Sequence, residues 1–437
     1  MPVGATFVMG KKGSSELMRR VLMVAQRFPP AGGVGTFRAT KFVKYLPSFG
    51  WEPVVLTLRE DCFPEAVWLD RGLERDIPQD IRVHRTGIWR TSLVNDEGIR
   101  WLPRLLPALV RAIMTERPEI LYLTGGPFFP LIAGPVMRGF FHLAYVVDLR
   151  DPWKLARRES RRSGLNARIG GVLTSVLEPW VVRFASKVIC VSETMCAEYR
   201  EHYKHLSAGK FVVIPNGYDP EDFDNLVPIR AEEPTIVYAG KFRTSEGFRD
   251  PVPFFEAMKL LAARGRQVNL LHIGREEPEI LRLAEETGVA DRVFQIGPLS
   301  YSETIAHGLG ADALLLIAGG QPTEQTGKVF DYIGCERPIL AIAPSHGEIA
   351  KVLRDIPGAW LVEPSNPETI CSLLVQLCFC ANISGGESGY RATRYERKHL
   401  AEELAMLLNA VQQYRSEGRR GRLERFCKAI VRGRKRS

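Results

Sequence analysis

Short apolar runs alternate with helical patterns along most of the chain. The first apolar run, at residues 21–25, leads into a turn rich in proline and glycine at 29–35 and then into a helical pattern over 36–49. The next apolar run, at residues 51–58, completes a β-loop-α-β unit. Continuous apolar runs of this length are typical of parallel strands that are buried on both faces. The pattern therefore predicts an α/β fold with parallel sheets.

The same alternation continues on both sides of one polar segment. Further strands are predicted at residues 119–124, 144–148, 187–192, 211–214, 235–239, 268–273, 293–296, 313–317, 339–342 and 359–362. Residues 219–234 are polar and acidic and contain three prolines, which is typical of a linker. We therefore expect a leader at 1–19, two doubly wound domains at 20–218 and 235–414, and a tail at 415–437.

Composition narrows the class of protein. The chain has 437 residues, of which 45% are hydrophobic and 25% charged, so it is neither wholly disordered, collagen-like nor a disulfide miniprotein. Its eight cysteines form no CxxC pair, which indicates free thiols in a reducing cytosol. No apolar run reaches about 18 residues, so no transmembrane helix is expected. The first 20 residues lack the apolar core of a signal peptide, and we interpret residues 1–19 as a flexible leader.

Most of the net charge of +9 lies in the tail. The segment from Arg415 to Ser437 carries ten basic and two acidic residues. Its apolar side chains follow helical spacing and form one face, at Leu423, Phe426, Cys427, Ile430 and Val431. A basic amphipathic helix is typical of proteins that bind an anionic membrane surface. Nucleic acid is the rival anion, but we find no nucleic-acid-binding module, and a solvated tail is the third alternative.

Glycines follow the first strand of the first domain. Gly32, Gly33 and Gly35 stand between that strand and the first helix, where backbone N–H groups can approach a phosphate or a sugar. Such turns are also common without a ligand.

A charged motif ends a later strand of the first domain. Asp148, Arg150 and Asp151 follow the strand at 144–148, at the edge where open α/β sheets bind ligands. An arginine between two carboxylates is equally a structural ion pair, so both alternatives stay open.

Three segments of the second domain carry candidate ligand-binding residues. Gly240, Lys241 and Arg243 end its first strand, and Gly297 and Leu299 follow the strand at 293–296. A polar loop then leads into a helix near Thr326, and this stretch holds Glu324, Thr326, Gly327, Lys328 and Asp331. A cation in a first helical turn is unfavourable unless an anion is present, which favours a phosphate beside Lys328. Lys328 and Asp331 share a helix face, so they bind phosphate and ribose respectively or pair with each other.

These motifs together resemble family-4 glycosyltransferases of the GT-B fold, nearest the bacterial cell-surface polysaccharide type. The resemblance covers about residues 20–410 and rests on the Gly-Gly turn and on four runs: VVDLRDPW at 146–153, VSE at 191–193, VIPNGYD at 213–219 and KVFDYIGCERPIL at 328–340. It implies two Rossmann-like domains that face each other across a cleft. It also implies a last helix that packs back on the first domain.

The resemblance further implies a retaining transferase that needs neither metal nor cofactor. The co-substrate would be a UDP- or GDP-sugar on the second domain, and the acceptor a lipid-linked sugar or glycan on the first. By position, Asp331 matches the acid that holds the ribose, and Lys241, Arg243 and Lys328 are the cations for the diphosphate. Asp148, Arg150, Asp151 and Lys328 would form the reaction centre. We expect the protein in the cytoplasm, peripheral on the inner face of the membrane.

Two departures from the family pattern keep other functions open. The family often has two glutamates separated by seven residues, where this chain has Thr323, followed by Glu324, and Asp331. The usual Lys-Gly pair reads Glu246-Gly247. A sugar-nucleotide epimerase on the same fold and a non-catalytic nucleotide-sugar-binding protein are therefore the alternatives.

Overall fold

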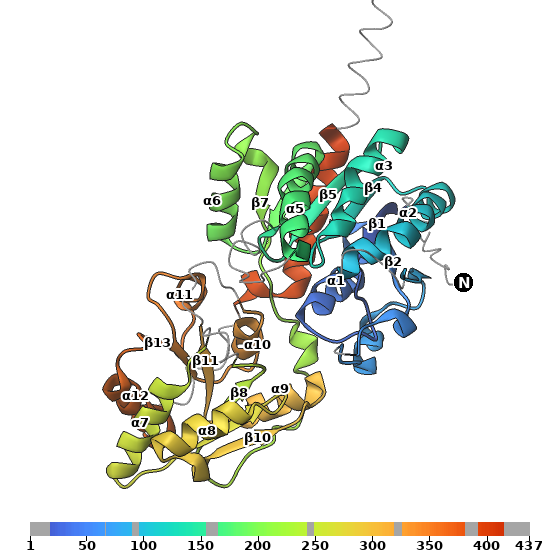
Figure 1. The fold of residues 1–437 in the computed structure, drawn as a ribbon. Coiled ribbons are helices and arrows are strands. Elements are labelled where there is room, and N and C mark those ends of the chain that lie inside the picture. Colours follow the sequence, from blue (N-terminus) through green and yellow to red (C-terminus); the bar gives the residue numbers. More distant parts are fainter. Residues whose placement is uncertain are drawn as a thin grey trace, which may run out of the picture.

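Two α/β domains, each built around one parallel sheet, make up the protein (Figure 1). The structure is a computed structural model that describes residues 18–65, 67–89, 96–153, 165–242, 249–318, 326–380 and 392–414. The predicted fold class, two Rossmann-like doubly wound domains, is confirmed.

The N-terminal sheet has seven strands in the order β3-β2-β1-β4-β5-β6-β7, and all neighbouring strands are parallel. Its strands are β1 (Arg19–Val24), β2 (Trp51–Leu58), β3 (Arg82–Thr86), β4 (Ile120–Thr124), β5 (Ala144–Leu149), β6 (Lys187–Cys190) and β7 (Phe211–Val213). The helices are α1 (Val34–Tyr45), α2 (Glu97–Glu116), α3 (Ala133–Phe141), α5 (Leu165–Phe184) and α6 (Glu193–His202). Since the strand order reverses at β1 and β4, a crevice for a ligand is expected beyond their carboxyl ends.

Helices cover both faces of this sheet. The apolar sides of α2, α3, α5 and α6 form one buried cluster with the sheet. On the other face, α1 packs beside a helix over residues 397–414, whose buried side chains include Leu400, Leu404 and Leu408. The Trp51 indole also donates a hydrogen bond to Asn409 Oδ1 at 2.9 Å. The end of the described chain is therefore held on the N-terminal domain, as its red helix in Figure 1 shows.

The C-terminal sheet has six parallel strands in the order β10-β9-β8-β11-β12-β13. These are β8 (Thr235–Ala239), β9 (Asn269–Ile273), β10 (Val293–Ile296), β11 (Ala313–Ile317), β12 (Ile339–Ile342) and β13 (Ala359–Val362). Its helices are α7 (Val252–Ala263), α8 (Pro278–Thr287), α9 (Tyr301–Gly310), α10 (Lys328–Gly334), α11 (Glu348–Leu353) and α12 (Pro367–Phe379). Helices α7, α8 and α12 cover one face, and α9, α10 and α11 cover the other. Its switch point lies between β8 and β11.

The sequence pattern does not predict strand β3. This edge strand is held by polar contacts, because Arg82 forms ion pairs with Glu52 and Glu116, and His84 lies 2.9 Å from Glu116. Half-buried charged side chains give no apolar run, so nothing in the pattern marks the strand. Among the described residues, the helices are too short or too polar to cross a bilayer.

Candidate active site

The glycine turn of the N-terminal domain lies at the switch point of its sheet. Gly33 is the N-cap of α1 and has φ +101°, a left-handed conformation that favours glycine. Among the described residues, no non-adjacent atom stands within 4 Å of a Cβ built there. At Gly35, a Cβ would lie only 1.6 Å from Arg150 Nη1. Gly32 is held by its N–H, which donates to Trp68 O at 2.7 Å. The turn is therefore open at Gly33 and closed at Gly35 by the guanidinium of Arg150.

Arg150 ties two loops of this edge together. Its Nε donates to Gly125 O at 2.7 Å and its Nη2 to Gly126 O at 2.6 Å, after strand β4. Burial lowers the pKa of Arg150, but an arginine remains charged at neutral pH. A positive charge thus stands beside the N-terminus of α1, where the helix dipole is also positive. Asp151, next in the chain, is exposed.

Asp148 lies inside the N-terminal domain. Its carboxylate is fully buried and accepts hydrogen bonds from Arg38 Nε at 2.8 Å and Arg38 Nη2 at 2.9 Å. Tyr122 Oη donates a third at 2.5 Å. Arg38 also donates to the carbonyls of Ile214 and Pro215, at 2.9 and 2.7 Å. Asp148 and Arg38 therefore join α1, β5 and the segment after β7 in one buried network, and the sequence analysis missed Arg38.

Three glycines line the corresponding edge of the C-terminal domain. Gly240, Gly274 and Gly297 follow β8, β9 and β10, and a Cβ on Gly274 would stand 3.3 Å from Gly240 O. Gly240 and Gly297 have positive φ angles of +91° and +99°. The buried His272 lies beneath, with its Nε2 2.8 Å from Gly240 O, and burial lowers its pKa. The described glycines therefore present backbone without side chains at this edge, and a neutral histidine supports it. Neither Gly274 nor His272 was among the predicted site residues.

Lys328 reaches across this edge from the first turn of α10. Its Nζ lies 3.8 Å from the centroid of the Tyr238 ring, and a Cβ on Gly240 would stand 3.0 Å from Lys328 Cε. Gly327 immediately precedes α10, and Leu299 is partly buried beside Gly297. The structure thus brings Lys328, Gly240 and Gly297 to one edge.

Of the remaining predicted donor-binding residues, two are described next to this edge and two lie outside the described residues. Lys241 is exposed, and Thr326 is half-buried directly before Gly327. Arg243 and Glu324, together with Thr323 and the Glu246-Gly247 pair, lie outside the described residues.

Asp331 is held by a tyrosine from the neighbouring helix. Tyr301 Oη donates to Asp331 Oδ1 at 2.8 Å. Burial raises the pKa of Asp331 to about 7, and the Tyr301 hydrogen bond opposes that rise. The carboxylate faces a cavity of only about 20 Å³, which has room for about one water molecule. The Tyr301 hydroxyl therefore occupies one hydrogen-bonding position of the Asp331 carboxylate.

The two edges meet at the start of α1. The ring of Phe37 packs on Tyr301 with centroids 4.5 Å apart, and Phe37 and Gly327 line the same small cavity. Phe37 is two residues beyond Gly35, and Gly327 is next to Lys328. The glycine turn of one domain therefore faces the Lys328 segment of the other.

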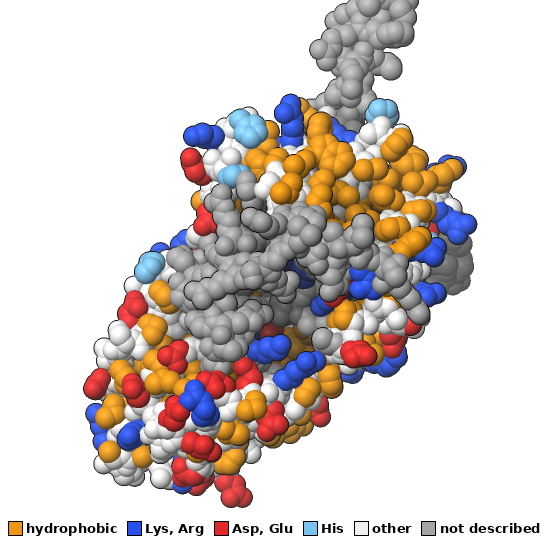
Figure 2. Space-filling view, viewed as in Figure 1, with side chains coloured by type: hydrophobic (Ala, Val, Ile, Leu, Met, Phe, Trp, Pro, Cys, Tyr) orange, Lys and Arg blue, Asp and Glu red, His pale blue; other side chains and the backbone are white. Residues whose placement is uncertain are grey.

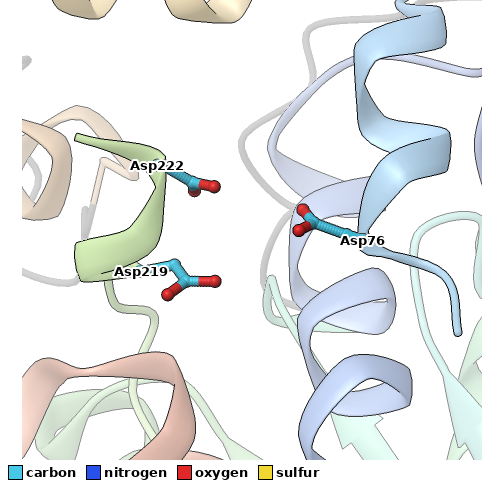
Figure 3. Close-up of side chains that lie close together, drawn as sticks. All are labelled: Asp76, Asp219 and Asp222. Carbon is cyan, nitrogen blue, oxygen red and sulfur yellow. The ribbon is translucent and has the colours of Figure 1, made fainter. Parts of the chain in front are cut away.

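An acidic cluster lies at the junction of the N-terminal domain and the segment after β7. The carboxylates of Asp76, Asp219 and Asp222 turn toward one another (Figure 3). Lys41 Nζ lies among them, at 2.7, 2.8 and 2.5 Å respectively, and Lys44 Nζ is 3.0 Å from Asp76 and 2.9 Å from Asp219. Two ammonium groups thus supply the positive charge, and the cluster acts as an ion-pair network that joins α1 to the start of the linker.

A large open cavity lies beside the Arg150 edge. It has a volume of about 1260 Å³, and Gly126 and Pro127 form part of its wall. The charged residues among the described residues of the lining are Arg27, Arg59, Arg100, Arg104, Asp61, Asp96 and Glu97. Because Arg150 donates to Gly126 O, this cavity adjoins the sheet edge that carries Arg150. The sequence pattern does not predict this cavity, since its arginines come from three separate segments of the chain.

Comparison with known proteins agrees with this two-domain arrangement. Residues 31–222 match the model of Glycosyltransferase Family 4. No curated protein sequence matches the chain. Among solved structures, HepE from Anabaena in complex with UDP is 14% identical, with 90% of this chain and 100% of that chain covered and a TM-score of 0.59.

Transferases and epimerases both occur among the similar structures. WaaG, a glycosyltransferase involved in lipopolysaccharide biosynthesis, is 16% identical over 89% of this chain and 99% of its own, with a TM-score of 0.56. The UDP-GlcNAc 2-epimerase from Methanocaldococcus jannaschii is 11% identical over 90% and 100%, with a TM-score of 0.53. The resemblance to family-4 glycosyltransferases is therefore confirmed over residues 31–222, and the chain as a whole has the GT-B fold.

Proposed function

We propose that this protein is a retaining, metal-independent glycosyltransferase that moves a sugar from a UDP- or GDP-sugar to a lipid-linked or glycan acceptor in cell-surface polysaccharide biosynthesis. The family match over residues 31–222 supports the transferase class. HepE was solved with UDP, and WaaG acts in lipopolysaccharide biosynthesis, which supports the donor class and the pathway class.

One observation carries the proposal, namely that each domain places a cation at its glycine-rich sheet edge and that the two edges meet at Phe37 and Tyr301. Arg150 stands beside the N-terminus of α1, and Lys328 lies over the bare glycine edge of the C-terminal domain. Positive charge beside glycine backbone suits a diphosphate. The same charges would stabilise the nucleoside diphosphate as it leaves, because negative charge develops on it in the transition state.

The network around Asp148 changes the role we propose for that residue. A fully buried carboxylate that is paired with Arg38 does not reach a substrate in this conformation. We assign Asp148 a positioning role, because its pair with Arg38 anchors α1 and hence the glycine turn. Arg150, Asp151 and Lys328 remain the proposed residues of the reaction centre.

Asp331 would bind the ribose only after a rearrangement. The Tyr301 hydroxyl holds its carboxylate in a cavity too small for a sugar. Tyr301 also packs on Phe37 of the other domain. A separation of the domains would remove that contact, and a turn of the Tyr301 side chain would then free Asp331.

The acceptor would bind in the large cavity beside Arg150. Its four arginines outnumber its three acids among the described lining, so it suits an acceptor that carries a phosphate or diphosphate. A lipid-linked acceptor fits a protein at a membrane surface. We propose that the basic tail at 415–437 holds the enzyme on the inner face of the membrane, in the cytoplasm.

An epimerase is the second candidate, because UDP-GlcNAc 2-epimerases share the fold. The test is to incubate purified protein with UDP- and GDP-sugars, with and without lipid-linked and glycan acceptors, and to measure released nucleoside diphosphate and sugar products. The proposal predicts release that depends on the acceptor. An epimerised sugar nucleotide formed from donor alone would establish the epimerase. Binding with no turnover under any acceptor would point to a non-catalytic protein.

A further inference from the structure

The outer face of α5 is apolar although it is exposed. Between Gly170 and Val182 the helix has one ionisable residue, Glu178, and its side chain is buried. The exposed side chains recur every four residues on one face, at Val172 (67% exposed), Val176 (65%), Trp180 (37%) and Phe184 (41%). A surface helix normally carries charged residues on its solvent face. This face is therefore suited to contact with an apolar partner.

The apolar face extends to the neighbouring helix. Phe140, near the end of α3, is 78% exposed, and Arg138 Nη1 donates to Phe184 O at 2.9 Å, which ties the ends of α3 and α5 together. Figure 2 shows hydrophobic side chains gathered over this part of the N-terminal domain, with basic side chains at the rim. Exposed patches of this kind mark interaction sites.

Basic residues stand at the end of α5. Arg183 is exposed beside Phe184, and Lys210 Nζ donates to Arg183 O at 3.0 Å. Burial, together with the charges of Arg138 and Lys187, lowers the pKa of Lys210 to about 8. Four cations thus lie around the aromatic end of the apolar face. Aromatic side chains combined with basic ones are typical of surfaces that sit at the headgroup level of an anionic bilayer.

We propose that the apolar face of α5 and the end of α3, with its basic rim, is a membrane-docking surface for anionic phospholipids. We call it the α5 face, defined by Val172, Val176, Trp180, Phe184 and Phe140 with Arg138, Arg183, Lys187 and Lys210. It is separate from the basic tail at 415–437, and it does not depend on the proposed transferase reaction. The two elements would hold the N-terminal domain against the bilayer at two places.

The experiment is co-sedimentation of the full chain with phosphatidylcholine vesicles, with and without phosphatidylglycerol. Trp180→Ser/Phe184→Ser removes two apolar side chains from the α5 face and should weaken binding at least roughly tenfold. Val227→Ser/Phe294→Ser is the matched control, because these side chains are 80% and 49% exposed and lie elsewhere. The control should bind like the natural chain. Unfolding midpoints of both variants should stay near that of the natural chain, since the substituted side chains are exposed.

A second pair of variants tests the contribution of the basic rim to vesicle binding. Arg138→Gln/Arg183→Gln should weaken binding roughly 10- to 30-fold, only with phosphatidylglycerol present and less at high salt. Arg264→Gln/Arg266→Gln, which removes two exposed arginines from the C-terminal domain, should have no such effect.

Quenching of tryptophan fluorescence by lipids distinguishes docking on a bilayer from binding to another partner. Lipids with brominated acyl chains should quench tryptophan fluorescence, and Trp180→Phe should lose part of that quenching while it still binds. Vesicle binding by Trp180→Ser/Phe184→Ser equal to that of the natural chain would overturn the proposal. A dimer that dissociates in this variant, with no vesicle binding by the natural chain, would assign the face to a second copy instead.

Discussion

Asp148→Asn should destabilise the N-terminal domain. The Asp148 carboxylate is fully buried and accepts two hydrogen bonds from Arg38, which is itself only 1% exposed. Removing one partner of a buried ion pair leaves an uncompensated charge and costs about 3–5 kcal/mol. Arg38 keeps the carbonyls of Ile214 and Pro215 as acceptors, so we expect the lower end of that range, about 3 kcal/mol.

Differential scanning calorimetry of the ligand-free protein measures this loss. For a domain of about 200 residues, 1 kcal/mol shifts the unfolding midpoint by roughly 2–4 °C, so the N-terminal transition should fall by roughly 6–12 °C. Asp151→Asn is the matched control, because it neutralises an exposed carboxylate three residues away, and it should stay within about 0.5 kcal/mol of the natural chain. The double variant Arg38→Met/Asp148→Leu removes both charges and should be more stable than Asp148→Asn.

An Asp148→Asn variant that keeps the unfolding midpoint of the natural chain but loses turnover would refute the positioning role of Asp148. Asp148 would then act on the substrate, and its buried pair with Arg38 would not describe the protein in solution.

Three further predictions concern the glycine turn, Asp331 and the tail. Gly35→Ala places a Cβ 1.6 Å from Arg150 Nη1, so the guanidinium must move, and affinity for the sugar nucleotide should fall at least roughly tenfold by calorimetry; unchanged affinity would contradict this. The pKa of Asp331 is raised to about 7, above about 3.9 in the unfolded chain, so its contribution to stability is complete below about pH 4 and is lost as pH rises through 7. Asp331→Asn should therefore raise the unfolding midpoint more at pH 8 than at pH 5. A difference independent of pH would show that ionisation of Asp331 is not what destabilises the natural chain at high pH. Deleting residues 418–437 should weaken binding to anionic vesicles, and unchanged binding would show that the tail does not hold the protein on the membrane.

The sequence predicted the buried strands well because a parallel strand between two helix layers is a continuous apolar run. The predicted strands at 51–58, 293–296 and 339–342 have the bounds of β2, β10 and β12. The edge strand β3 was missed because the ion pairs of Arg82 and the contact of His84 with Glu116 stabilise it, and such polar contacts leave no periodic pattern.

The candidate site was predicted only where a local motif carries it. Lys328 and Gly240 come together because both follow strands at the same sheet edge. The partner of Asp148 could not be predicted, since Arg38 lies 110 residues earlier and no spacing rule links them. Gly274 was missed for a similar reason, because its role depends on the contact with Gly240 and not on its own neighbours in the chain.

The most direct test of the central claim is calorimetric titration of UDP- and GDP-sugars into the natural chain, Lys328→Ala and Lys259→Ala. Lys259 is an exposed lysine on α7 of the same domain, so it controls for the loss of one positive charge. A diphosphate site at Lys328 predicts that the natural chain and Lys259→Ala bind one sugar nucleotide equally. Lys328→Ala should bind it roughly 10- to 100-fold more weakly, since a hydrogen bond to a charged group is lost. Equal affinity in Lys328→Ala, or no binding of any sugar nucleotide to the natural chain, would contradict a diphosphate site between the two domains.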